Sequence, residues 1–534
     1  MNRRDLLKAL GVMGASLTVP QMMGRNAGAA VSQRELRNAR AIVAGEINFV
    51  KPTSLPTVIN IFLYGGPSEL AGNLTNIDRI NFDSQNKYTT VRGDILTDSV
   101  FSNNSVTGQI TANKFWANAG GLIMEDLLAP AATIVPGTPQ MSVIRTINRV
   151  VDDNKAHRES IFSAQTGGVA TMESPGMGTV LAAILRAKIP EYDSQDSNLI
   201  LPFVSFEGDT VLYDQGDIND LPLPLRSVSL DNGFNNPYRR QKLSAIAQNG
   251  LRNCLVNGTL LDCNVALENL ASANAATAGK FDRLTKSLIK RRELDAYFTS
   301  GALSAPAGKV PATVIDGTLA TGSIVTGSTV SQGTSNFTGS FGAALRAAVV
   351  LALGNQDVPG SRIGTRFITI GGGLGGWDDH DNSIQKYEQR MTDVMSNIRT
   401  ALRLLSTGTA TNGVLDGNAR NDVIINMYGE FGRNVNLNGS MGWDHGNNMN
   451  LYTFGGSAIP GRVLGQVVGT TKVIGTPGQN RLFTSPADGS VQWEPFSIAA
   501  TVYRQFGVQN PEVITKDPTI PGAANGFGSI PGLG

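Results

Sequence analysis

The stretch TVINIFLYGGPS, residues 57–68, decides the fold class. Its first eight residues, Thr57–Tyr64, form a largely apolar run rich in β-branched and aromatic side chains. Gly65, Gly66 and Pro67 then end the run abruptly. An apolar run of this length, bounded by turn residues, predicts a central strand that is buried on both faces, as in a parallel sheet.

Other segments along the chain repeat this pattern and alternate with helical ones. Strands are predicted at Met141–Arg145, Leu199–Phe206, Arg366–Ile370 and Asp422–Met427. The clearest helix has apolar residues at steps of three and four from Ile384 to Leu405, with Asp381 or Ser383 expected to cap its start. Further helices are predicted at Gln33–Ala44, Gly178–Ala187, Lys280–Tyr297, Gly342–Leu353 and Phe496–Phe506. The alternation predicts an α/β fold, with a mostly parallel sheet covered by helices on both faces.

The N-terminus has the features of an export signal. Arg3 and Arg4 precede a short apolar stretch, Leu6–Val19, and the small residues 27–29 are typical of a cleavage site. We therefore expect residues 1–29 to be a twin-arginine signal peptide. The mature protein would then be a partner of the twin-arginine export machinery, periplasmic or secreted, and without a transmembrane span. The alternative is a cytosolic amphipathic helix.

The remaining residues are expected to form one large domain, 30–518, followed by a flexible Gly/Pro-rich tail, 519–534. Two insertions are predicted at about 208–279 and 313–339, and the second is either a surface loop or a β-hairpin. Cys254 and Cys263 either close a disulfide or stay reduced. The formal charge of +1 provides no basic surface for nucleic acid, so we expect no nucleic-acid partner.

Only three histidines occur in the 534 residues, and each lies among acids, hydroxyls or glycines. His157 lies in NKAHRES, His380 in GGWDDHDN and His445 in GWDHGNN. His157 and His380 follow predicted strands, where parallel α/β sheets place their ligand sites, and His445 follows a polar loop. The sequence therefore predicts that the three histidines share one site.

Acids close to two of these histidines indicate a metal site. Asp378, His380, Asp444 and His445 offer carboxylate oxygens and imidazole nitrogens, and Glu430 could add another carboxylate. This donor set suits a divalent metal, with Zn, Mn, Ca and Mg all open. We expect donor atoms of Asp378, His380, Glu430 and His445 to converge to within about 5 Å. Arg433 is a candidate catalytic residue that would hold an anionic oxygen of a small ester substrate. The alternative is that these residues only make turn and capping hydrogen bonds.

His157 is expected to begin a helix near the same site. It is a candidate catalytic residue together with Ser160, since the helix N-terminus favours an anion; Ser163 is a second candidate nucleophile. A purely structural capping role is the alternative for both serines.

Taken in order, these motifs resemble a known family. The twin-arginine start, GGPS (Gly65–Ser68), GGWDDH (Gly375–His380), GEFGR (Gly429–Arg433) and WDHG (Trp443–Gly446) are similar to the exported bacterial DUF1501 proteins. The similarity runs roughly from Leu55 to Val513. DUF1501 in turn resembles the sulfatases and the alkaline-phosphatase superfamily.

The resemblance implies a three-layer α/β/α sandwich, alkaline-phosphatase-like, with one or two divalent metals. It implies Asp378 and His380 as ligands of one metal, Glu430 near an acidic ligand position and His445 as the late histidine ligand. The chain departs from the family pattern at Ala71, where members usually have an acid, and at Asp379, where they have threonine. It also lacks a sulfatase-type nucleophile motif.

Two functions follow as expectations. The first is an exported metal-dependent hydrolase of phosphate or sulfate esters. The second is a non-catalytic exported binding or cell-surface assembly protein that retains the fold.

Overall fold

A computed structural model gives the architecture of the chain. It describes residues 46–68, 100–101, 110–111, 120–128, 138–149, 156–167, 176–189, 203–205, 225–226, 254–256, 259–261, 337–354, 365–371, 376–406, 420–434, 438, 440, 442–469, 471–474, 483–515 and 528–534.

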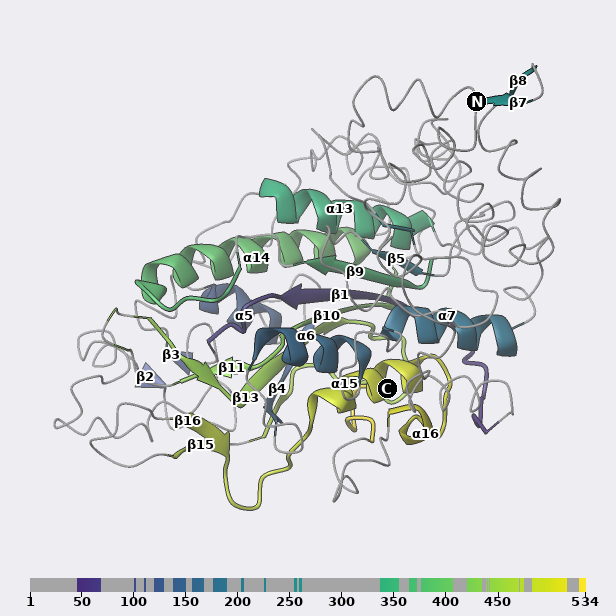
Figure 1. The fold of residues 1–534 in the computed structure, drawn as a ribbon. Helices are drawn as coiled ribbons and strands as arrows, with labels where there is room; N and C mark the ends of the chain where they lie inside the picture. The colour runs from purple at the N-terminus through teal and green to yellow at the C-terminus, as the bar shows by residue number, and fades with distance from the viewer. Residues whose placement is uncertain are drawn as a thin grey trace, which may run out of the picture.

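An eight-stranded sheet forms the centre of the molecule (Figure 1). In spatial order it contains β14 (Val467–Val468), β4 (Met141–Asn148), β13 (Asn448–Gly455), β10 (Val423–Gly429), β1 (Thr57–Leu63), β9 (Phe367–Gly371), β5 (Phe203–Ser205) and β6 (Leu225–Arg226). The predicted strands are confirmed, and β1 lies between β10 and β9 as a central, fully buried strand.

The expectation of a mostly parallel sheet is only partly right, because the sheet is mixed. β13 runs antiparallel to both of its neighbours, β10 and β4, while the other neighbouring pairs are parallel. Residues 430–447 join the end of β10 to the start of β13 without a crossover helix among the described residues. A connection that stays at one edge of the sheet must return the chain antiparallel, which explains the direction of β13.

Helices cover both sides of this sheet (Figure 1). On one side lie α13 (Gly339–Gly354) and α14 (Ser383–Ser406), and on the other lie α6 (His157–Thr166), α7 (Met177–Lys188) and α15 (Pro495–Gln505). α5 (Gly121–Leu128) packs against α14 and β4, and α16 (Glu512–Thr515) follows α15. The predicted helices within the described ranges are thus confirmed, and the fold is α/β.

Four two-stranded pairings complete the described secondary structure. They are β2 (Val100–Phe101) with β3 (Ile110–Thr111), β7 (Cys254–Val256) with β8 (Thr259–Leu261), β11 (Gly432–Arg433) with β12 (His445–Gly446), and β15 (Thr471–Ile474) with β16 (Phe483–Pro486). Of these, β11 with β12 contributes directly to the candidate site.

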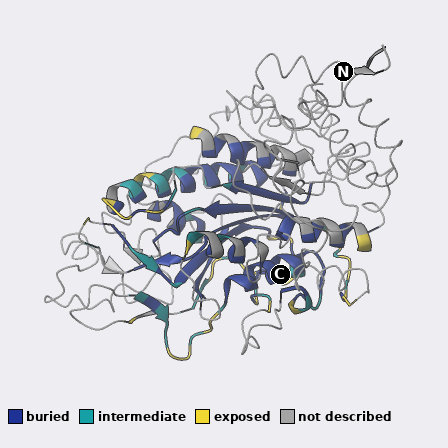
Figure 2. Ribbon diagram, in the orientation of Figure 1, coloured by how far each residue is buried: buried dark blue, intermediate teal, exposed yellow. Residues whose placement is uncertain are grey.

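The core lies between the sheet and its helices, and the central strands are buried along their length (Figure 2). Val58 and Phe62 of β1 pack in one cluster with residues of α7 and α15, such as Leu181 and Val502. Each large apolar side chain buried in this way stabilises the fold by about 1.5–3 kcal/mol. The rigid core holds the strand ends, and therefore the loops that follow them, in fixed positions.

The end of the predicted flexible tail belongs to the folded structure. Ile530 and Leu533 are buried, and the carbonyl of Leu533 accepts a hydrogen bond of 2.7 Å from the side chain of Gln505. The backbone nitrogen of Val463 donates to the carbonyl of Gly532 over 2.7 Å. The two apolar side chains explain why residues 528–534 dock despite their high Gly and Pro content.

Several predictions lie outside the described residues, wholly or in large part. These are the signal peptide 1–29, the helices Gln33–Ala44 and Lys280–Tyr297, the insertions at about 208–279 and 313–339, and the pairing of Cys254 with Cys263. Among the described helices, none is both long and apolar enough to cross a membrane.

Candidate metal centre

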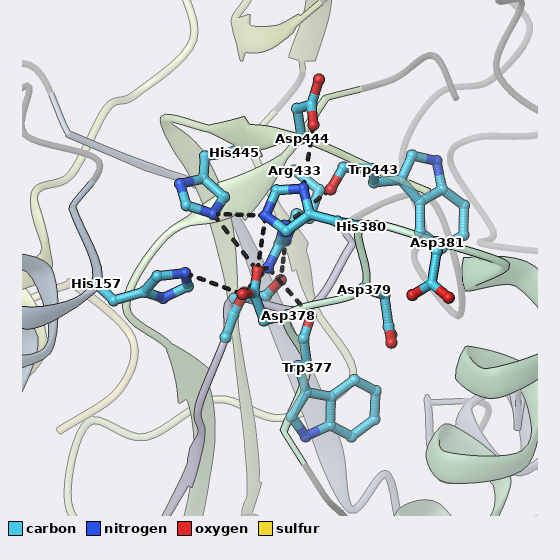
Figure 3. A network of polar contacts seen from close by, with 12 residues as sticks. His157, Trp377, Asp378, Asp379, His380, Asp381, Arg433, Trp443, Asp444 and His445 are labelled. Atoms are coloured by element: carbon cyan, nitrogen blue, oxygen red, sulfur yellow. Dashed lines mark hydrogen bonds and ion pairs between the residues drawn. The ribbon is translucent and has the colours of Figure 1, made fainter. Parts of the chain in front are cut away.

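The predicted site residues meet where β1, β9 and β10 end (Figure 3). Gly65 follows β1, Asp378 lies in the loop after β9, and Glu430 follows β10 directly. His157 joins them from the first turn of α6. The parallel strands thus place their carboxyl-end loops together, as expected for this class of sheet.

The turn after β1 brings two backbone segments into close contact. Gly65 and Gly66 have φ values of +106° and +69°, which favour glycine. A side chain on Gly65 would overlap the backbone nitrogen of Asp378, and one on Gly66 would overlap Phe431. The backbone nitrogen of Trp377 also donates to the carbonyl of Tyr64. The two glycines therefore let the loop after β9 lie directly on the end of β1.

The tight turn Trp377–His380 sends consecutive acids in different directions. Asp378 is 44% exposed and faces the histidines, whereas the Asp379 side chain is only 6% exposed. Both carboxylate oxygens of Asp379 accept hydrogen bonds from Arg390 of α14, at 2.8 and 2.9 Å. Burial raises the pKa of Asp379 although Arg390 acts to lower it. Asp379 therefore anchors the loop to α14 and is not part of the candidate site.

The start of α14 is tied to the same region. Ser383 is its first residue, but its hydroxyl donates to the carbonyl of Asp379 over 2.6 Å and accepts the backbone N–H of Trp443 over 3.2 Å. Asp381, the other expected capping residue, pairs with Lys386 at 2.7 Å.

The motifs GEFGR and WDHG meet as a small antiparallel ladder. Gly432 pairs with Gly446, and Arg433 pairs with His445. A side chain on Gly432 would overlap the carbonyl of Asn448. The glycines of both motifs thus permit the close packing that brings His445 beside Arg433.

Arg433 was predicted to hold a substrate oxygen, but its guanidinium is turned inward. Its side chain is 1% exposed. Nε donates to the Gly66 carbonyl over 2.8 Å, and Nη1 donates to the Trp443 carbonyl over 2.8 Å. Nη2 donates to Asp378 Oδ1 over 2.6 Å and also to the carbonyls of Gly65 and Trp377. Arg433 therefore links three loops of the site, and this geometry favours a positioning role over direct substrate binding.

Glu430 holds His157 and the β1 turn together. It is fully buried, and its Oε1 accepts the backbone N–H of Gly65 at 2.7 Å and lies 2.9 Å from Nδ1 of His157. On the other side of the ring, His157 Nε2 lies 3.3 Å from Asp378 Oδ2. The hydrogen bond with Glu430 is the main reason that the pKa of His157 is raised, against the opposing effect of burial.

Three donor atoms form a compact triangle beside Glu430 and His157. Asp378 Oδ1 lies 3.0 Å from His380 Nε2 and 3.5 Å from His445 Nε2, and the two imidazole nitrogens are 3.2 Å apart. The side chains are 44%, 45% and 22% exposed for Asp378, His380 and His445. Asp378, His380 and His445 therefore converge well within the expected 5 Å, at a solvent-accessible edge of the sheet.

Asp444 lies outside the triangle, behind His380. Its Oδ1 is 3.1 Å from His380 Nδ1 and accepts a hydrogen bond of 3.2 Å from Asn438 Nδ2. Of the predicted ligands, Asp444 thus contacts Nδ1 of His380, and Glu430 contacts Nδ1 of His157.

The predicted serine nucleophiles are not favoured by this geometry. Ser160 lies in α6 beyond His157, and its side chain has no exposed surface; Ser163 is equally buried. His157 does begin α6, as predicted, but the N-cap residue Ala156 makes no side-chain capping bond. A fully buried hydroxyl cannot reach a substrate at the exposed carboxylate of Asp378 unless the helix moves.

The donor set fits a divalent cation. His157, Asp378 and His445 offer ligand atoms that all lie within 4.8 Å of one another, and His380 extends this group through the triangle. Ligands about 2.0–2.1 Å from a tetrahedral metal stand roughly 3.3 Å apart, which is close to the triangle's edges.

The charges of the cluster agree with this fit. The three carboxylates of Asp378, Glu430 and Asp444 against the single guanidinium of Arg433 leave a formal charge of −2 when the imidazoles are neutral. The pKa of Asp378 is lowered although burial would raise it, because Arg433 hydrogen-bonds the carboxylate. Asp378 is therefore ionised at neutral pH, as a metal ligand must be.

Two residues near the site were not predicted from the sequence. The ring of Phe431 lies 5.1 Å from that of His157 and 4.4 Å from that of His445. Arg149 is fully buried and donates to the backbone carbonyl of Glu430 over 3.1 Å. Phe431 lies inside the GEFGR motif, so the sequence could have indicated it. The sequence around Arg149 contains no motif that would have indicated this residue.

Comparison with known proteins gives one family. A family model described as "Protein of unknown function (DUF1501)" matches residues 361–484. This match supports the DUF1501 family. The DUF1501 match contains Asp378, His380, Glu430, Arg433 and the WDHG motif, whereas Gly65 and His157 lie outside it. No curated protein and no solved structure matches the chain.

Proposed function

We propose that this protein is a metal-dependent hydrolase of phosphate or sulfate esters. The observation that supports it best is the triangle of Asp378 Oδ1, His380 Nε2 and His445 Nε2, with edges of 3.0–3.5 Å. Two imidazoles and a carboxylate at this spacing form a donor set typical of Zn²⁺, Mn²⁺ and related ions.

In this proposal Asp378, His380 and His445 hold the cation. When bound, a divalent cation polarises an ester oxygen and provides a nucleophile at neutral pH. The exposed edges of Asp378 and His380 leave room for an anionic ester to approach from solvent. Even with His157 protonated, the three carboxylates outnumber the positive charges of Arg433 and His157, so the cluster would repel such an anion and substrate binding in this proposal depends on the cation.

His157 is the proposed acid. Its Nδ1 is held against Glu430 at 2.9 Å, and the raised pKa keeps a proton on the ring at a higher pH than usual. A proton at Nε2, beside Asp378, is at the correct edge of the site to be donated to a leaving oxygen. Arg433 holds Asp378 and the loops in place.

Metal analysis of the purified protein tests the proposal. We expect about one equivalent of a divalent metal or more in the wild-type protein, and none in the His380→Ala/His445→Ala double variant. Asp381→Asn is the matched control, because Asp381 is adjacent in sequence but pairs with Lys386 outside the cluster. A folded wild-type protein that takes up no Zn, Mn, Ca or Mg would exclude this function.

Hydrolysis is tested on a panel of aryl phosphate and aryl sulfate esters. We expect the metal-loaded wild-type protein to hydrolyse at least one class, and the His157→Gln variant to retain the metal but lose at least tenfold in rate. Activity that is the same with and without the metal would count against the metal's role.

A second function has one specific observation in its favour. Arg433 already provides a counter-ion to Asp378 at 2.6 Å, so the cluster is partly neutralised by the chain itself. Ala71, in the position of an expected family acid, points the same way. This second candidate is a non-catalytic exported binding or assembly protein, for which metal-free protein should be folded and fully functional.

The proposal includes export of the protein and an alkaline-phosphatase-like fold. The Arg3-Arg4 start supports export by the twin-arginine route to the periplasm or beyond. Helices on both sides of the sheet support an alkaline-phosphatase-like three-layer sandwich. Fractionation of cells that express the chain with Arg3 and Arg4 replaced by lysine tests the route, since an exported protein should then stay in the cytoplasm.

A further inference from the structure

We infer that Glu430 and Asp444 are positioning residues that each hold one histidine ring, and are not metal ligands. The inference rests on the proposed metal centre and assigns different roles to acids that the sequence groups together. Each carboxylate contacts Nδ1 of a different histidine, and this leaves both Nε2 atoms directed at Asp378.

Glu430 is placed to orient His157. Its side chain is fully buried, and Oε1 is shared between Gly65 N–H at 2.7 Å and His157 Nδ1 at 2.9 Å. The Gly65 N–H can only donate, so it keeps an acceptor oxygen at this position. This acceptor is closer to Nδ1, at 2.9 Å, than Asp378 Oδ2 is to Nε2, at 3.3 Å, and therefore favours a proton on His157 Nδ1.

Asp444 is placed to do the same for His380. Its Oδ1 lies 3.1 Å from His380 Nδ1, and Asn438 Nδ2 donates to that same oxygen over 3.2 Å. The backbone carbonyl of Asp444 also accepts the N–H of Asn434 over 2.7 Å, which fixes the loop. His380 Nε2 is thus directed to the triangle with Asp378 and His445.

Carboxylates in this position have a known physical effect on metal-binding histidines. They fix the ring tautomer and orientation and raise the basicity of the ligating nitrogen. The competing assignment is direct ligation by Glu430 Oε2, which is buried and has no hydrogen-bond partner among the described residues. The two assignments differ in the effect of Glu430→Gln on metal binding, whereas the ring tautomers test whether each carboxylate orients its histidine.

The first test reads the ring tautomers in metal-free protein. Labelling histidine with ¹⁵N gives signals from only three rings, which His157→Gln and His380→Gln variants assign. At a pH where each ring carries one proton, we expect the Nδ1–H form for both His157 and His380. Glu430→Ala should release this preference for His157 alone, and Asp444→Ala should release it for His380 alone. The Nε2–H form in the wild-type protein would overturn the inference.

The second test measures Zn²⁺ affinity by competition with a chelator. Asp444→Asn keeps an oxygen for the metal-binding His380, so we expect affinity to fall by about 10–100-fold. Glu430→Gln keeps an oxygen for Gly65 and for His157, which is not a ligand, so affinity should stay within about tenfold of the wild-type value. His445→Ala, which removes a ligand, should abolish binding. If Glu430→Gln abolishes binding as His445→Ala does, Glu430 is a ligand and the inference is wrong.

The two tests separate this inference from the proposed function. If the wild-type protein takes up none of Zn, Mn, Ca and Mg, the proposed function fails, while the ring tautomers still test whether the two carboxylates orient the histidines. If Zn²⁺ binds but no ester is hydrolysed, the positioning roles stand and only the catalytic proposal is lost.

Discussion

Gly65 shows how a single residue without a side chain controls the site. Its φ of +106° and the backbone of Asp378 directly against it leave no space for a β-carbon. At the same turn its N–H binds Glu430 and its carbonyl accepts from Arg433. A contact between residues 365 positions apart therefore depends on one glycine.

Gly65→Ala should lower the free energy of unfolding by more than about 3 kcal/mol, because backbone strain and steric overlap add together. Gly489→Ala is the matched control: Gly489 has a φ of +76° but nothing within 4 Å of a β-carbon. The control should lose only about 1–2 kcal/mol, the cost of the left-handed conformation. Urea unfolding measures both, and equal losses would show that the overlap at Gly65 is unimportant.

Residue identities were predictable from the sequence where motifs mark them, but side-chain direction was not. The sequence identified Asp378, His380 and His445, since they stand in the short motifs GGWDDH and WDHG. It could not foresee that Arg433 is turned inward. That direction depends on carbonyls of Gly65, Gly66, Trp377 and Trp443, which only the folded chain brings together.

Helix α14 is connected to the loop that carries Asp378 and His380 by one ion pair. Arg390 binds both oxygens of the buried Asp379, next to Asp378. The loop that carries two of the donors is therefore anchored to a 24-residue helix that packs on α13.

Arg390→Gln should lower the free energy of unfolding by about 3 kcal/mol at neutral pH, since it leaves a buried carboxylate unpaired. The folded-state pKa of Asp379 is already raised, and loss of Arg390 raises it further. Ionisation of Asp379 then opposes folding as the pH rises through that pKa, whereas below about pH 3.9 the carboxyl is protonated in both states. The destabilisation should therefore be larger at neutral pH than at low pH.

Urea titrations at both pH values measure this difference. Lys386→Gln, which breaks the exposed pair with Asp381, should leave stability unchanged at either pH. A pH-independent loss for Arg390→Gln would show that packing, and not the charge of Asp379, explains the effect.

The positions of strands and helices were largely predictable, whereas one strand direction was not. Apolar runs identified β1, β4, β5, β9 and β10, and the three-and-four spacing identified α14. The run in β13, NMNLYTFG, contains enough asparagine to resemble a loop, although all eight residues are buried. Its antiparallel direction depends on the path of residues 430–447, which local patterns do not encode.

At the scale of the whole molecule, the C-terminal residues 528–534 pack against α15. Ile530→Ala and Leu533→Ala should each lower the free energy of unfolding by about 2–5 kcal/mol, since both side chains are buried. Pro531→Ser changes an exposed residue between them and should alter stability by less than about 0.5 kcal/mol. Thermal or urea unfolding provides the measurement. Three equal, small effects would restore the interpretation of this segment as a flexible tail.

The general architecture followed from the sequence because buried strands and amphipathic helices have strong local patterns. The docking of residues 528–534 was missed for the opposite reason: Gly and Pro obscure the two apolar side chains that anchor them. The arrangement of the site was predictable in outline, since strand ends gather at one edge of a sheet.

The sequence separation of the site residues has a consequence for the order of events during folding. Glu430 and His157 are 273 residues apart, and Gly65 and Glu430 are 365 apart. Contacts this distant form late, once the sheet between them has assembled. An ion that needs these groups together has no binding place on a partly folded chain. The compartment in which the chain completes its folding would therefore decide which metal the protein acquires.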